Sequence, residues 1–78
     1  MKSHLTMSEL EKLGFKIFES YSHDGWTTQR RKKGCITVDT TYNLKSGNFE
    51  SQEVKVDDGE WRDFLPHELE ILDKILNK

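Results

Sequence analysis

Alternating apolar and polar residues are clearest between Cys35 and Val56. Two runs rich in β-branched residues flank the sequence Lys45-Ser46-Gly47, a pattern typical of a β-hairpin with a three-residue loop. Gly47 can adopt the left-handed conformation that closes such a loop. The loop predicts a register in which Leu44 faces Asn48, Val38 faces Val54 and Ile36 faces Val56.

The same alternation predicts one apolar and one polar face for this hairpin. Two aliphatic pairs, each worth a few tenths to about 1 kcal/mol, lie on the apolar face. A slip of one residue would place Val38 opposite Lys55 and turn the valines of the second strand away. The side chains expected on the polar face are Thr37, Asp39, Thr41, Asn43, Glu50 and Gln52.

Two further strands are predicted before this hairpin, over residues 15–21 and 26–30. The sequence Ser22-His23-Asp24-Gly25 between them is typical of a turn, and Asp-Gly is the strongest turn signal within it. Residues 31–34 are predicted to form a second turn, with Gly34 left-handed. If this turn closes like the one at Gly47, the register pairs Arg30 with Ile36, Thr28 with Val38 and Trp26 with Thr40.

That register has two consequences for function. Trp26 would extend the apolar face of the sheet. Four consecutive cations would gather on the tip of a hairpin: Arg30, Arg31, Lys32 and Lys33.

Both ends of the chain predict helices. Thr6 and Glu9 stand at capping-box spacing, Leu5 and Leu10 can form a hydrophobic staple, and Gly14 is a C-terminal stop. Pro66 suits the first turn of a second helix. The apolar stripe of that helix consists of Leu65, Leu69, Leu72 and Leu76, widened by Ile71 and Ile75.

The order of these elements predicts the fold class. Short turns between strands favour an antiparallel meander, and a helix at each end can cover one sheet face. We therefore expect a single α+β domain over residues 1–78. It has two layers: a short N-terminal helix, a four-stranded antiparallel meander and an amphipathic C-terminal helix (α-β-β-β-β-α).

Composition narrows the class of protein. A chain of 78 residues buries roughly 60% of its unfolded surface, so its core is thin. The net charge of −2 argues against a dedicated polyanion binder. One cysteine excludes an intrachain disulfide. Neither a membrane-spanning apolar run nor a signal-peptide region is present, so we expect a cytoplasmic protein outside the membrane.

Residues suited to catalysis or metal binding are scattered. His4, His23, His67 and Cys35 do not stand at ligand spacing, so no metal or cofactor is expected. Cys35 could act as a nucleophile only beside a basic partner, and a strand cysteine more often packs as a small apolar residue. The sequence therefore predicts a protein that is not an enzyme.

The basic tip is the leading candidate for binding. Arg30, Arg31, Lys32 and Lys33 could contact an acidic protein surface, with Trp26 or Trp61 as an aromatic anchor. This predicts a small protein-binding module, of the kind that serves as an accessory or inhibitor protein in bacteria, phages and mobile elements. Nucleic-acid binding through the same tip is the alternative. An alternative role for Trp61 is to close one end of the core. A homodimer is a further alternative, because a thin core gains stability from a partner chain.

One stretch resembles a known family. Residues 8–15, Ser-Glu-Leu-Glu-Lys-Leu-Gly-Phe, followed by Ser22-His23 before a strand, look somewhat like the start of HicA-type mRNA-interferase toxins. That resemblance implies a ribonuclease with His23 as the catalytic residue. It covers less than a third of the chain. Tyr21 stands where the family has glycine, the last helix is acidic and a strand is added, so we do not adopt the assignment.

Overall fold

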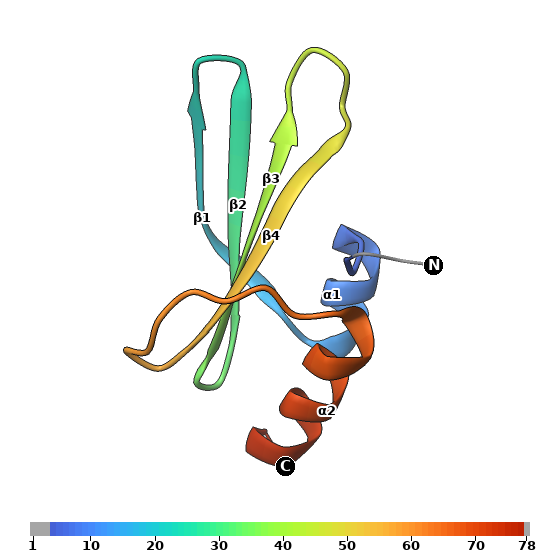
Figure 1. Ribbon diagram of the computed structural model, residues 1–78, viewed down its shortest axis with the longest axis vertical. Coiled ribbons are helices and arrows are strands. Elements are labelled where there is room, and N and C mark those ends of the chain that lie inside the picture. Colours follow the sequence, from blue (N-terminus) through green and yellow to red (C-terminus); the bar gives the residue numbers. More distant parts are fainter. Residues whose placement is uncertain (1–3, 78) are drawn as a thin grey trace.

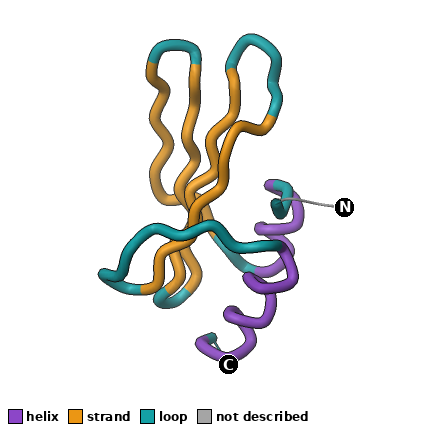
Figure 2. Tube along the Cα trace, in the orientation of Figure 1, coloured by secondary structure: helices purple, strands orange, loops and turns teal. Residues whose placement is uncertain are grey.

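Four antiparallel strands, joined in chain order by tight turns, form the sheet of the computed structural model, which describes residues 4–77 (Figure 1). Both helices lie on the same side of this sheet, as the trace coloured by secondary structure also shows (Figure 2). The predicted α-β-β-β-β-α architecture is confirmed. In order, the elements are α1 (Met7–Leu13), β1 (Lys16–His23), β2 (Trp26–Lys33), β3 (Ile36–Asn43), β4 (Phe49–Val56) and α2 (Pro66–Leu76).

The register of β3 against β4 is confirmed where it matters for the core. Val38 lies opposite Val54, and Ile36 lies opposite Val56. The predicted pairing of Leu44 with Asn48 is wrong, because a shift in register after Thr41 places Tyr42 opposite Phe49. Past this shift, the Asn43 side chain accepts hydrogen bonds from the backbone N–H groups of Lys45 (2.9 Å) and Ser46 (3.1 Å). An asparagine that bonds the backbone ahead of it stabilises a turn.

The predicted register of β2 against β3 is wrong. The turn consists of Gly34 and Cys35 alone, so Lys33 lies opposite Ile36 and Arg31 opposite Val38. The register differs from the predicted one by three residues, and an odd shift exchanges the two faces of a strand. Trp26 therefore lies opposite Asn43, on the face away from the helices, and does not extend the apolar face.

The predicted helix ends are confirmed. The Thr6 hydroxyl accepts a hydrogen bond from the Glu9 N–H at 3.1 Å, and the Glu9 carboxylate accepts one from the Thr6 N–H at 3.0 Å. Gly14 ends α1 with φ at 99°. Pro66 begins α2, and the Leu65 N–H donates to the Glu68 carboxylate at 2.8 Å.

The core lies between the helices and one face of the sheet. Its buried apolar side chains come from both helices, from strands β3 and β4, and from the segments on either side of α1: Leu5, Leu10, Phe15, Ile36, Val38, Val54 and Leu69. The wide apolar stripe predicted for α2 is only partly correct: Leu69 and Leu72 pack at the core, whereas Leu65, Leu76, Ile71 and Ile75 are exposed. Asp73 is buried on the core-facing side of α2 instead, where its carboxylate accepts a hydrogen bond from Lys33 Nζ at 2.8 Å.

Gln52 is a polar residue inside this core. It was expected on the polar face, but it shares the helix side of β4 with Val54 and is buried. Its amide oxygen accepts from the Leu5 N–H at 3.1 Å, and its amide nitrogen donates to the Leu5 carbonyl at 2.9 Å and the Thr40 hydroxyl at 3.1 Å. One side chain thus satisfies the backbone of the segment leading into α1.

Candidate functional site: the helix-free face

The sheet face that carries no helix, named here the helix-free face, presents its side chains in rows across the strands. Since paired residues of antiparallel strands share a face, the register defines each row. The first row is Lys16, Lys32, Thr37 and Lys55, and the second is Glu19, Arg30, Asp39 and Glu53. The third is Tyr21, Thr28, Thr41 and Ser51, and the fourth is His23, Trp26 and Asn43. The first of these is called the lysine row below.

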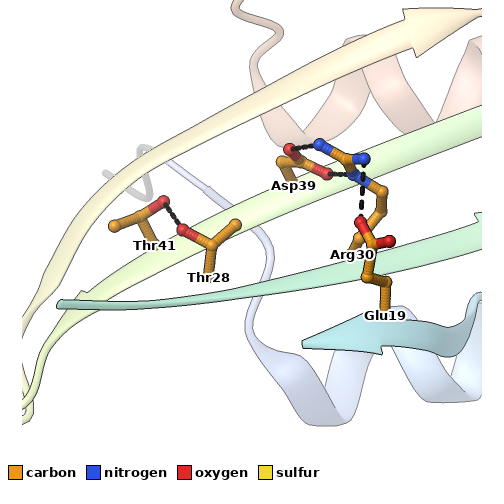
Figure 3. Close-up of polar contacts among 5 residues, drawn as sticks. All are labelled: Glu19, Thr28, Arg30, Asp39 and Thr41. Atoms are coloured by element: carbon orange, nitrogen blue, oxygen red, sulfur yellow. Dashed lines mark hydrogen bonds and ion pairs between the residues drawn. The ribbon is translucent and has the colours of Figure 1, made fainter. Parts of the chain in front are cut away.

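Arg30 is the centre of this face (Figure 3). Its Nε and Nη2 donate to the two oxygens of Asp39 at 2.7 and 2.9 Å, and its Nη1 donates to Glu19 at 3.0 Å. The hydrogen bonds to Asp39 raise the pKa of Arg30 above its ordinary value, and burial lowers it. The negative charges of Asp39 and Glu19 also raise this pKa, so the net shift is upward. A bidentate pair of this kind fixes the guanidinium plane.

Trp61, which follows β4 in the chain, packs its ring against two cations of this face. Its ring centroid lies 5.3 Å from the Arg30 guanidinium carbon and 4.9 Å from Lys55 Nζ, within the range of cation–π attraction. The next residue, Arg62, exchanges backbone hydrogen bonds of 2.8 Å in both directions with Val54 on β4. Trp61 therefore lies on the helix-free face, while Phe64 packs against the core.

Two exposed aromatic side chains occupy the other end of the face. Tyr21 is 47% exposed and Trp26 is 41% exposed. Beside these rings, the hydroxyls of Thr28 on β2 and Thr41 on β3 lie 2.8 Å apart and form a hydrogen bond (Figure 3). The face thus combines apolar rings, hydroxyls, a fixed ion-pair network and lysines on one rigid sheet.

The structure divides the residues predicted to bind a partner. Trp26, Arg30, Lys32 and Trp61 all lie on the helix-free face, where Trp61 contacts Arg30. Arg31 and Lys33 point to the helix side: Arg31 is buried, with Glu11 at 3.6 Å, and Lys33 pairs with Asp73. The basic hairpin tip is therefore a wrong prediction, because side chains alternate along a strand and the turn begins only at Gly34.

The sequence did not single out Glu19, Asp39, Lys16 or Lys55 as members of this site. Asp39 was expected on the polar face, and its place there is confirmed. Its contact with Arg30 depends on the two-residue turn at Gly34 and Cys35. With that turn known, strand alternation alone would have placed Arg30 opposite Asp39.

Residues with catalytic chemistry are not brought together in the part of the chain that the structure describes. The His23 side chain is 82% exposed at the end of β1, where its Nε2 lies 3.3 Å from Asp24. Cys35 lines an open hollow of about 400 Å³ with Lys32, Thr37, Asp57 and Asp58. Within residues 4–77, no group of three His, Cys, Asp or Glu side chains could hold a metal ion.

Comparison with protein-family models, with curated proteins and with solved structures gave no match. None of the helices among the described residues is both long and apolar enough to cross a bilayer.

Proposed function

We propose that this chain is a small, non-enzymatic protein-binding module whose helix-free face docks onto another protein. The observation that carries the proposal is the pair of exposed rings, Tyr21 and Trp26, beside an arginine fixed between two carboxylates. Aromatic and arginine side chains are the usual anchors of protein interfaces. The ion pairs that fix Arg30 leave its side chain little conformational entropy to lose on binding.

The charges of the face favour a protein partner over a nucleic acid. Arg30 is committed to Asp39 and Glu19, and a phosphate approaching it would meet both carboxylates. The face carries four cations, Lys16, Arg30, Lys32 and Lys55, against three carboxylates, Glu19, Asp39 and Glu53. A dedicated polyanion site carries a clearer basic excess.

The rows also suggest the chemistry of the partner surface. Lys32 and Trp26 are six residues apart on β2, which corresponds to about 20 Å along the sheet. A complementary partner would present acidic groups to the lysine row and an apolar patch to Tyr21 and Trp26. Nucleic-acid binding through the lysine row and these rings is the second candidate.

The test uses three variants of the tagged protein in pull-downs from the source organism. A Tyr21→Ser/Trp26→Ser variant removes the rings, and a Lys32→Glu/Lys55→Glu variant reverses two charges of the lysine row. Ile71→Ser/Ile75→Ser, on the exposed side of α2, is the matched control. We expect the wild type and the control to recover the same partner, and both face variants to lose it. A partner retained by both face variants would exclude this face.

The second candidate is tested separately by fluorescence polarisation with random single-stranded and duplex DNA and RNA at low salt. The proposed function predicts no binding by any of these probes. Binding that weakens steeply with salt and is lost in the Lys32→Glu/Lys55→Glu variant would replace protein binding with nucleic-acid binding.

A further inference from the structure

We infer that β1 is a pairing edge for a second copy of this chain, which adds its own β1 antiparallel to the first. β1 forms one edge of the sheet, and all eight of its residues are exposed. At the opposite edge, β4 has a backbone partner in Arg62. An exposed edge strand presents unpaired N–H and C=O groups to any strand that can align with it.

The turn after β1 determines which of its backbone groups point outward. Asp24 and Gly25 both have positive φ, 42° and 85°, as a two-residue type I′ turn requires. In such a turn the two flanking residues, here the pair His23 and Trp26, form a hydrogen-bonded pair. Because bonded and non-bonded pairs alternate along an antiparallel ladder, the N–H and C=O groups of Ser20 and Ser22 point away from β2.

The sequence of this edge is complementary to itself. Residues 19–23 read Glu-Ser-Tyr-Ser-His, so an antiparallel copy centred on Tyr21 places Ser20 opposite Ser22 of the second copy and Ser22 opposite Ser20. These are the residues whose backbone groups point outward, and they would exchange four hydrogen bonds. The same register places Glu19 opposite His23 of the second copy, at both ends of the segment.

Charge and regularity favour this register over its neighbours. A shift of two residues one way brings Phe18 into the pairing, where a bulge between Ile17 and Glu19 interrupts β1. The opposite shift brings in the turn residue Asp24. Glu19 has one oxygen on Arg30, and His23 has Nε2 near Asp24. The second carboxylate oxygen and His23 Nδ1 remain to join the two copies.

The pairing would join two sheets into one, with both helix-free faces on the same side and the two Tyr21 rings side by side at the centre. Such an interface repeats the same contacts on each copy, as a two-fold dimer requires. It is independent of the proposed function, although a dimer would present two such faces to a repetitive partner.

Sedimentation velocity over a wide range of protein concentration tests the inference. Ser20→Pro removes an outward N–H without breaking the β1–β2 ladder, which suits proline at an edge strand. Ser20→Ala is the matched control, because it keeps the N–H. We expect a reversible wild-type dimer whose Kd is unchanged in Ser20→Ala and raised about tenfold or more in Ser20→Pro, with circular dichroism confirming that each variant is folded.

Disulfide trapping tests the register and does not depend on the proline variant. In a Cys35→Ser background, Tyr21→Cys places two thiols at a non-hydrogen-bonded pair, where Cα atoms lie about 4.5 Å apart and a disulfide fits. Ser46→Cys, in an exposed turn, is the control. We expect rapid oxidation to a covalent dimer for Tyr21→Cys alone. A wild type that stays monomeric up to millimolar concentration, or trapping no faster than the control, would overturn the inference.

Discussion

At the scale of single residues, Asp73 shows how packing changes the role of a side chain. Although it is a carboxylate on a short helix, it is buried beside Lys33 and Asn77. Burial raises the pKa of its carboxyl group, while hydrogen bonds from Lys33 and Asn77 and the charge of Lys33 lower it, and the net shift is downward. Asp73 therefore stabilises the fold in its ionised form.

The lowered pKa of Asp73 makes its contribution to stability depend on pH. Because the folded-state pKa of Asp73 is lower than the unfolded one, its contribution is complete above the ordinary value of 3.8 and is lost as pH falls through the folded-state value. We expect Asp73→Asn to lower the free energy of unfolding by about 2 kcal/mol at neutral pH, and by progressively less in acid. Urea unfolding across pH measures this, with the exposed Glu70→Gln as control. A deficit independent of pH would contradict it.

At the scale of elements, β1 differs from the other strands. Its residues are all exposed, whereas β3 carries four buried residues and is bonded on both sides. Hydrogen bonding to one neighbour alone leaves alternate amides of β1 in contact with solvent. The type I′ turn at Asp24 and Gly25 identifies these amides as Ser20 and Ser22.

Amide hydrogen exchange checks this assignment. In dilute solution, where association is negligible, we expect the Ser20 and Ser22 amides to exchange at least about tenfold faster than those of Glu19 and Tyr21. The measurement is made by NMR at single-residue resolution. The opposite order would mean that Glu19 and Tyr21 point outward, and the pairing register proposed for β1 would fail with it.

At the scale of the whole molecule, one core connects both helices to the sheet. Leu10 of α1 and Leu69 of α2 are buried in the same cluster as Val38 and Val54. Gln52 adds a polar link between the sheet and the backbone of Leu5. Since neither helix has another apolar layer to pack on within the described residues, we expect the chain to unfold as one unit.

That expectation is tested with Leu10→Ala and Leu69→Ala. Each should lower the free energy of unfolding by about 3 kcal/mol, a large share of the 5–15 kcal/mol that is usual for a small domain. Tryptophan fluorescence and far-UV circular dichroism should report coincident transitions. Ile71→Ala, on the exposed side of α2, should cost less than about 0.5 kcal/mol. Separate transitions would contradict a single domain.

The sequence by itself determined the elements and their order. The capping box of Thr6 and Glu9, the stop at Gly14, Pro66 and the hairpin pairing of Val38 with Val54 all depend on residues close in the chain or on simple alternation. Such signals are local, so they can be read before the fold is known.

The tertiary structure decided which face each side chain occupies. A two-residue turn at Gly34 and Cys35, instead of a longer one, exchanges the faces of β2, burying Arg31 and placing Trp26 and Arg30 on the helix-free face. The length of a turn is a local property, but a change by an odd number of residues moves every side chain of the strand to the other face, because side chains alternate with period two. The packing of α2 likewise buries Asp73 and leaves Ile75 exposed, and Lys33 supplies the charge that offsets the burial of the carboxylate.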